Sequence, residues 1–193
     1  MTVNQRDDGT WSNALEDRIV VKPYSANWPI AFQQEATAIR NVIAADSDIR
    51  LEHFGSTAVP GLAAKPIIDI LLIAPDQSQW PLLIDPLASL GYVYWADNPN
   101  RQRMFFVKGM PPFGQGRSHH VHVRTPEDAQ AALRFRDYLC AHPAMATRYA
   151  TLKRSLATAH ATDREGYTAA KGEFVRAVLS QIAIADYAQG PND

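Results

Sequence analysis

The sequence predicts an α/β (α+β) fold in which a small mixed β-sheet is flanked by helices and followed by a helical C-terminal half. Short β-type runs alternate with helical patterns over the first two thirds of the chain, and the last third has helical periodicity throughout. The 193 residues, 46% of them hydrophobic and 20% charged, suit one domain with a sizeable core. We expect this domain over residues 18–188, with a flexible extension over residues 1–17 and a tail over residues 189–193.

Composition also restricts the partners and the location. The formal net charge of -1 provides no overall positive field, so we expect neither long nucleic acid nor a membrane surface as a partner. No apolar run reaches the roughly 18 residues of a membrane span, and residues 1–17 lack the apolar segment of a signal peptide. These features predict a cytoplasmic protein and leave its oligomeric state open.

The domain is expected to begin with a short strand over residues 19–21 and a helix. Asn27 can cap this helix, and Pro29 lies in its first turn, where a missing N–H group does no harm. Its apolar face consists of Phe32, Ala36, Ile39 and Ile43. Glu35 lies off this face, so the helix should pack on one side.

Two strands are expected around a shaped loop. Residues 49–54 alternate in polarity and lead directly into the turn at residues 55–57. Residues 67–74 are almost wholly aliphatic, which is typical of a strand buried on both faces. The connection at residues 58–66 contains two prolines and a glycine, so we expect a loop there and no long helix.

The middle of the chain should continue with a helix and three strands. The helix starts at Asp76 or Ser78 and ends at Gly91, and Pro86 should kink it or split it in two. The strands are expected over residues 92–95, 103–108 and 119–124. The loop at residues 109–118 is rich in glycine and proline, so we expect a mobile flap.

Three helices should complete the chain. Thr125 is a suitable N-cap, followed by proline at the first helical position and two acidic residues in the first turn. A second helix begins at Pro143, and a third follows the polar break at Asp163. These three helices form the expected helical half.

Gly55, Ser56 and Thr57 are candidates for phosphate binding. Glycine permits close approach of a ligand, and successive backbone N–H groups with hydroxyls attract anions. An ordinary tight turn is the alternative, because the sequence matches neither the P-loop nor the dinucleotide fingerprint.

Asp69 is a candidate metal ligand because it lies inside an aliphatic strand, where a charge is costly unless it is paired. Carboxylates hold Mg²⁺ in phosphoryl-transfer sites. The alternative is a buried carboxylate that is satisfied by backbone donors, by Lys65 or by an arginine.

His120 and His122 should point to the same face of their strand, and His119 to the other. The pair can hold a metal or donate to phosphate oxygens. Half-buried sheet residues with hydrogen-bonding neighbours are the alternative.

The predicted helices carry two pairs of tyrosine and lysine four residues apart. Tyr149 and Lys153 form one pair, and Tyr167 and Lys171 the other. An aromatic ring beside a cation suits base stacking and phosphate neutralisation. A solvated helix face, with lysine stems packed on the rings, is the alternative.

The stretch HFGSTAVPGLAAKPIID over residues 53–69 closely resembles the GrpB family, and VKPYSANWP at residues 21–29 and HVHV at residues 120–123 resemble it too. The resemblance extends over nearly the whole domain. It implies a nucleotidyltransferase-like fold, in which Gly-Ser at a strand end holds phosphates and acids on the next strand hold Mg²⁺. Gly55, Ser56 and Asp69 match those positions, but the second acid of active nucleotidyltransferases is replaced by Leu71.

The first functional hypothesis is a nucleotidyltransferase or related phosphoryl-transfer enzyme that acts on a nucleotide and a small-molecule acceptor. Its cofactor would be Mg²⁺ or another divalent metal, with a nucleoside triphosphate as co-substrate. The candidate catalytic residues are Ser56, Asp69, His120 and His122, of which Asp69, His120 and His122 are also the candidate metal ligands. The candidate phosphate- or nucleotide-binding residues are Gly55, Ser56, Thr57, Lys65, Arg103, Tyr149, Lys153, Tyr167 and Lys171.

Two alternatives remain open at this point. Leu71 favours a binding module that holds a nucleotide or another phosphorylated ligand without catalysis. The two histidines favour a metal enzyme centred on His120 and His122, such as a phosphoesterase.

Overall fold

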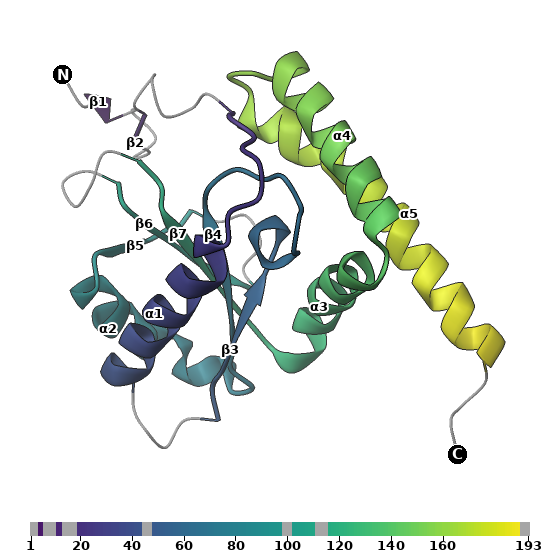
Figure 1. Ribbon diagram of the computed structural model, residues 1–193. Coiled ribbons are helices and arrows are strands. Elements are labelled where there is room, and N and C mark those ends of the chain that lie inside the picture. Colours follow the sequence, from purple (N-terminus) through teal and green to yellow (C-terminus); the bar gives the residue numbers. More distant parts are fainter. Residues whose placement is uncertain are drawn as a thin grey trace.

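The centre of the fold is a five-stranded mixed sheet (Figure 1). Its strands are β3 (Arg50–Phe54), β4 (Ile68–Ile73), β5 (Tyr92–Tyr94), β6 (Met104–Lys108) and β7 (His119–Arg124). The strand order is β3-β4-β7-β6-β5, in which β4 and β7 are parallel and the other neighbours antiparallel. The predicted α/β class with a mixed sheet is therefore confirmed.

The helices are α1 (Asn27–Val42), α2 (Ile84–Ser89), α3 (Pro126–Ala141), α4 (Pro143–Ala159) and α5 (Arg164–Gln189). Two 3₁₀ segments, η1 (Ser56–Ala58) and η2 (Gln77–Leu83), complete the regular structure of the sheet region. Apart from these elements, β1 (Asn4–Gln5) pairs antiparallel with β2 (Trp11–Ser12).

The computed structural model describes residues 4–5, 11–12, 19–43, 48–97, 102–110 and 116–189. Most of the expected N-terminal extension, the centre of the expected flap and residues 190–193 of the expected tail lie outside these residues. Within the described residues, no helix combines the length and hydropathy needed to cross a membrane. The cytoplasmic location stays a prediction.

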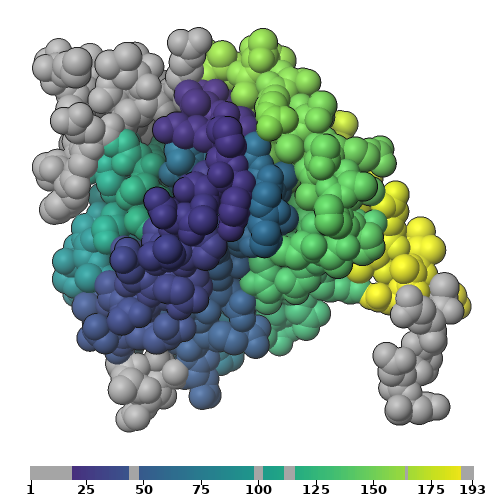
Figure 2. All heavy atoms as spheres, in the orientation of Figure 1, coloured from purple at the N-terminus to yellow at the C-terminus, as the bar shows by residue number. Residues whose placement is uncertain are grey.

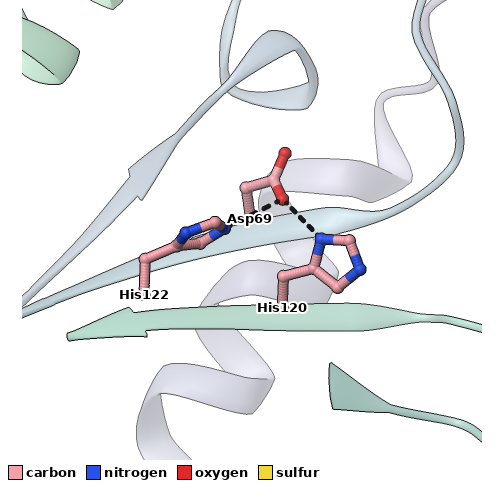
Figure 3. A group of neighbouring side chains, drawn as sticks. All are labelled: Asp69, His120 and His122. Carbon is pink, nitrogen blue, oxygen red and sulfur yellow. Dashed lines mark hydrogen bonds and ion pairs between the residues drawn. The ribbon is translucent and has the colours of Figure 1, made fainter. Parts of the chain in front are cut away.

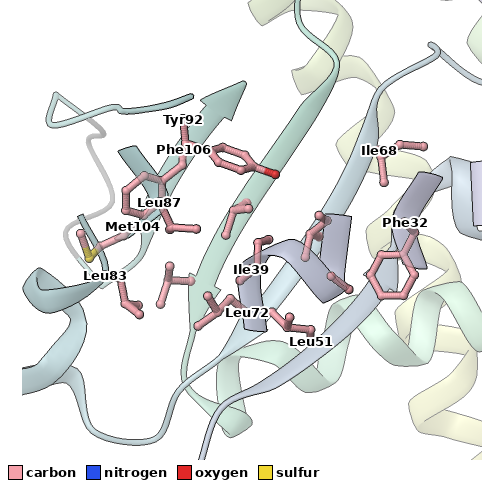
Figure 4. Packing of buried hydrophobic residues seen from close by; sticks show 14 of the residues in the cluster. Phe32, Ile39, Leu51, Ile68, Leu72, Leu83, Leu87, Tyr92, Met104 and Phe106 are labelled. Atoms are coloured by element: carbon pink, nitrogen blue, oxygen red, sulfur yellow. The ribbon is translucent and has the colours of Figure 1, made fainter. Parts of the chain in front are cut away.

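One face of the sheet carries the largest hydrophobic cluster, under α1 and α2 (Figure 4). Phe32 and Ile39 project from α1 onto Ile70 and Leu72 of β4 and onto their neighbours. Ile39, Ile70 and Leu72 are fully buried. The helical spacing of the α1 residues and the period of two in β4 together produce this layer.

The helical half covers part of the opposite face (Figure 1). In the space-filling view, its green and yellow atoms form the right side of the molecule (Figure 2). Helix α3 packs against β3, β4 and β7, where Leu71 and Ile73 meet Ala129 in a second cluster. A third cluster joins Val59 and Leu62, from the loop after η1, to the helical half. Residues of β4 are thus buried on both faces, as its aliphatic sequence predicts.

Three local expectations need correction or refinement. Residues 19–21 do not form a strand: the adjacent Lys22 makes an isolated bridge to Ala64, and the loop around Ala64 offers no extended ladder. Glu35 is buried rather than exposed, because Lys108 of β6 reaches it under α1. The helix expected over residues 76–90 is split into η2 and α2, and the break lies at Ile84, just before Pro86.

Candidate functional site

Three side chains converge on the face of the sheet that α3 covers in part: Asp69, His120 and His122 (Figure 3). Nδ1 of His120 lies 3.0 Å from Oδ1 of Asp69, and Nε2 of His122 lies 3.7 Å from the same oxygen. One ligand atom of each residue lies within 4.8 Å of the others. The side chains remain 28%, 13% and 25% exposed, respectively, so the cluster is accessible to a ligand.

The sheet register produces this convergence. Asp69 of β4 stands opposite His120 of the parallel strand β7, and Leu71 stands opposite His122. Because side chains alternate along a strand, His120 and His122 share the face of Asp69, as expected, and His119 points to the other face.

The electrostatics of the cluster favour an ionised carboxylate beside a neutral imidazole. Burial by itself raises the pKa of Asp69, but hydrogen bonds from His120 and His122 outweigh it, so that the pKa lies well below its usual range. Burial lowers the pKa of His120, although the hydrogen bond to Asp69 opposes this shift. A metal ion requires an ionised carboxylate and neutral imidazoles, and it would take the place of the hydrogen-bonding protons between Asp69 and the two histidines.

Two phenylalanines that the sequence reasoning missed hold the imidazole rings. Phe105 of β6 lies with its ring centroid 5.0 Å from that of His120 and 4.8 Å from that of His122. Phe54 of β3 contacts His122 edge to face at 5.0 Å. Alternation along β3 and β6 could have predicted the face of the sheet on which each phenylalanine lies. Only the strand order shows that both lie next to the histidines.

The Gly-Ser turn lies directly against the carboxylate. Gly55 has φ 71° and ψ -169°, a conformation that is essentially restricted to glycine. A Cβ atom at this position would lie 2.6 Å from Oδ2 of Asp69. Gly55 therefore serves both the chain turn and the close approach of backbone to carboxylate.

Thr57 links the turn to the next strand. Its hydroxyl is buried, donates to the carbonyl of Ile67 at 3.3 Å and lies 3.1 Å from Nε2 of His53. The His53 ring stacks on Phe32, and burial, aided by Arg136 and opposed by Asp69, lowers its pKa to about 4. These contacts indicate that Thr57 shapes the turn, while its predicted phosphate contact stays a prediction.

Lysines of the helical half lie close to this turn. Lys171 has a pKa lowered by burial, and the negative charge of Asp69 opposes that shift. Lys153 is 2% exposed and donates to the carbonyl of Ala63 at 2.5 Å. Burial, together with the charges of Lys171 and Arg154, lowers the pKa of Lys153 to about 7. The positive charges crowd one another, which favours binding of an anion here.

Tyr149 and Tyr167 contact the lysines four residues away, as their spacing predicts. Nζ of Lys153 lies 4.8 Å from the Tyr149 centroid, and Nζ of Lys171 lies 4.4 Å from the Tyr167 centroid. Nζ of Lys65 lies 5.2 Å from the same Tyr167 centroid. Both tyrosines are buried.

Burial leaves little room for a base on these rings. Phe174 already stacks on Tyr149, with the centroids 4.9 Å apart. Burial raises the pKa of Tyr149, and the Ser56 hydroxyl opposes the shift, so this phenol lies beside the Gly-Ser turn. Stacking of a nucleobase on Tyr149 or Tyr167 stays a prediction that would require these rings to be uncovered.

Arg103 is engaged at the other end of the sheet. It precedes Met104, which pairs with Val123 near the end of β7, away from His120. Its guanidinium donates to both carboxylate oxygens of Asp128, at 2.6 Å and 2.5 Å. Arg103 therefore does not lie beside Asp69, and its predicted role in phosphate binding stays a prediction.

The donor set does not match Mg²⁺ well. Mg²⁺ demands octahedral coordination, mostly by oxygen, whereas Asp69 is accompanied by two imidazoles. Leu71, at the place of the expected second acid, is fully buried in the cluster with Phe54, Ile73 and Ala129. Among the described residues, the convergent group of potential metal ligands is this one carboxylate and two histidines.

Comparisons with known proteins find relatives in both sequence and structure. A UPF0157 protein, PA4798, from Pseudomonas aeruginosa is 52% identical over 179 residues, which cover 93% of this chain and 74% of that protein. The crystal structure of the conserved protein GrpB from Enterococcus faecalis superposes with a TM-score of 0.73 at 34% identity, covering 84% of this chain and 99% of that one.

A cytoplasmic RNA terminal U-transferase shares 14% identity with a TM-score of 0.48, covering 68% of this chain and 40% of that one. This likeness is too distant to inform activity. The model of the GrpB protein family matches residues 18–181, which include the Gly-Ser turn, Asp69, both histidines and Lys171. This chain therefore belongs to the GrpB family.

Proposed function

We propose that this protein is a phosphoryl-transfer enzyme of the nucleotidyltransferase type, acting on a nucleotide and a small-molecule acceptor. The observation that carries the proposal is the close approach of Gly55 to the Asp69 carboxylate, where an added Cβ atom would lie 2.6 Å from Oδ2. A phosphate held on the Gly55-Ser56 turn would lie beside Asp69 and the two imidazoles. Phosphoryl transfer requires a positioned phosphate beside groups that stabilise its charge, and this arrangement would supply both.

The surrounding charges support an anionic ligand. Lys171 is half-buried, and the negative charge of Asp69 raises its pKa against the effect of burial. Lys153 lies near Lys171 in the helical half. Neither lysine forms an ion pair with a carboxylate among the described residues. An entering phosphate would relieve the repulsion between them.

The roles of the residues follow from their positions. Gly55 allows close approach of the phosphate, the Ser56 hydroxyl orients it, and Lys171 stabilises its negative charge. Phosphoryl transfer needs alignment and charge stabilisation more than covalent chemistry by the protein. The ligand we propose is thus a small phosphorylated molecule or a nucleotide. A nucleotidyltransferase also uses divalent ions, and of these Mg²⁺ is poorly matched by the imidazole donors.

Nucleotide binding tests this proposal. We expect a nucleoside triphosphate from a panel of ATP, GTP, CTP and UTP to raise the melting temperature in the presence of a divalent ion. Lys171→Met should weaken that binding about 10-fold, since it removes a charge-assisted contact. Arg176→Met is the matched control, because Arg176 is an exposed cation on the same helix and should leave the affinity unchanged. Absence of binding for every triphosphate with Mg²⁺, Mn²⁺ or Zn²⁺ would contradict the proposal.

A binding module without catalysis is the second candidate, and Leu71 is the observation that favours it. The buried leucine supplies no second carboxylate for a two-metal phosphoryl transfer. An assay of pyrophosphate release distinguishes the enzyme from the binding module. It uses the bound triphosphate and a panel of small hydroxyl and amine acceptors. Tight binding without turnover supports the module, and turnover that disappears in Asp69→Asn supports the enzyme.

A further inference from the structure

The nature of the metal can be inferred from the donor atoms of the same site. Two imidazole nitrogens and one carboxylate oxygen suit zinc or iron, which accept nitrogen donors readily. Donors about 2.1 Å from one ion at tetrahedral or octahedral angles lie about 3.0–3.4 Å apart. The observed separations from Oδ1 of Asp69, 3.0 Å to His120 and 3.7 Å to His122, are close to this range.

The surroundings hold the donors in position. His122 is held between Phe54 and Phe105, and His120 rests against Phe105. Strands β4 and β7 are neighbours in the sheet, so the backbone positions of Asp69 and His120 are set by ladder hydrogen bonds. A metal site built on strands, with packed ligand rings, costs little reorganisation on binding.

The site also lacks what Mg²⁺ needs. The next outward position on β4 is Leu71, which is fully buried against α3. Within the described part of the chain, no further carboxylate or cysteine joins the group. Asp69 is therefore the single carboxylate of this group. A hard ion such as Mg²⁺ would depend on water for most of its oxygen ligands.

We propose that Asp69, His120 and His122 form a site for a single borderline divalent ion, such as Zn²⁺ or Fe²⁺, and that Mg²⁺ is not its resident ion. Three protein ligands would leave coordination positions open for a further ligand, and the Gly55-Ser56 turn lies beside the Asp69 carboxylate. The ion and the carboxylate together carry a net positive charge, which adds to that of Lys171 and favours a phosphate as the further ligand. This inference deepens the proposed function, because it concerns the same site.

Direct metal binding tests the inference. Untagged protein with Cys140→Ser, which removes an exposed thiol, is stripped with chelator and titrated calorimetrically with Zn²⁺, Co²⁺ and Mg²⁺. We expect one tight Zn²⁺ or Co²⁺ per chain, bound at least about 100-fold more tightly than Mg²⁺. The visible absorption of bound Co²⁺ should report nitrogen ligation.

Substitutions show whether the binding belongs to this site. Asp69→Asn, His120→Ala and His122→Ala should each weaken Zn²⁺ binding by at least about 100-fold. His119→Ala is the matched control, because His119 is the neighbour of His120 on the same strand but faces the opposite side, beside Ser118. Its Zn²⁺ affinity should be unchanged. If His120→Ala does not fold, His122→Gln serves in its place, with circular dichroism as the check.

The outcomes separate the two proposals. Binding of Mg²⁺ as tight as Zn²⁺, or Zn²⁺ affinity that His120→Ala and His122→Ala leave unchanged, would overturn the metal inference. Tight Zn²⁺ binding without affinity for any nucleoside triphosphate would confirm the metal site and overturn only the proposed function.

Discussion

Asp69 shows how a single residue can mark a site before its partners are known. A charge in an aliphatic strand needs compensation, and the sequence suggested Lys65, an arginine or backbone donors. The structure instead brings His120 and His122 to its carboxylate. Two imidazoles do not neutralise a carboxylate as a lysine does, so they leave Asp69 able to bind a cation.

Gly55 is the second residue on which the site depends, and Gly55→Ala is the corresponding prediction. The change should destabilise the protein by about 1–3 kcal/mol, because alanine is strained in this backbone conformation, and its Cβ would also collide with Asp69. Urea unfolding measures the loss, and Zn²⁺ titration should show weakened binding.

Gly61→Ala is the matched control for this prediction. Gly61 has a similar φ of 76°, but no atom lies within 4 Å of the added Cβ. Its variant should lose less stability and retain Zn²⁺ binding. Equal losses in the two variants would show that the contact with Asp69 contributes nothing.

Among the elements, α3 determines how the helical half meets the sheet. At its N-terminus, Thr125 accepts a hydrogen bond from the backbone of Asp128, and Arg103, which directly precedes β6, donates to the Asp128 carboxylate. Further along the helix, Arg136 donates to Glu52 and to the carbonyl of His53 on β3. Helix α3 is thus attached to strands on both sides of β4, over the face that carries Asp69.

Arg103→Met tests whether Arg103 belongs to this attachment or to the ligand site. We expect a loss of about 1 kcal/mol in unfolding free energy, since the pair with Asp128 is partly exposed. Nucleotide and Zn²⁺ affinities should stay within twofold of the parent, because the residue lies at the opposite end of β7 from His120. A nucleotide affinity lowered as far as by Lys171→Met would instead place Arg103 in contact with the ligand.

At the scale of the whole molecule, the helical half and the sheet are joined through the loop that follows the Gly-Ser turn. Val59 and Leu62 pack against Leu139, Tyr149 and Ala150, and Lys153 reaches the Ala63 carbonyl from α4. The loop therefore connects the Gly-Ser turn to the helices that carry the lysines. Its prolines and glycine shape it for this contact rather than for regular structure.

The pH dependence of global stability should reveal the buried Lys153. Its pKa is about 7 in the folded protein and 10.5 at its ordinary value, so between these values the unfolded chain binds one more proton. Stability should therefore rise with pH in this window, by about 1.4 kcal/mol per pH unit relative to Lys153→Met. Urea unfolding at about pH 7.5, 8.5 and 9.5 measures the difference in unfolding free energy between wild type and Lys153→Met.

Arg148→Met provides the comparison for this pH series, because Arg148 is an exposed cation on the same helix. Its stability should follow the wild-type profile. Parallel profiles for wild type and Lys153→Met would mean that Lys153 remains charged in the folded protein.

The sequence by itself determined the order of the elements and, for most of them, which side chains share a face, because both depend on local periodicity. The alternation of residues 119–124 placed His120 and His122 together, and the aliphatic run around Asp69 predicted a strand buried on both sides. The Gly-Ser turn, Asp69 and the missing second acid at Leu71 were also visible in the sequence.

Only the tertiary structure decided which residues meet. Asp69 and His120 are 51 positions apart and become neighbours because β4 pairs in parallel with β7, and a pairing between distant strands leaves no local periodicity. For the same reason the sequence did not reveal that Phe105 supports the histidines or that Asp128 engages Arg103. The burial of Tyr149 and Tyr167 likewise arises from helices packing on one another, so helical spacing alone could not distinguish a packed ring from a ligand-binding one.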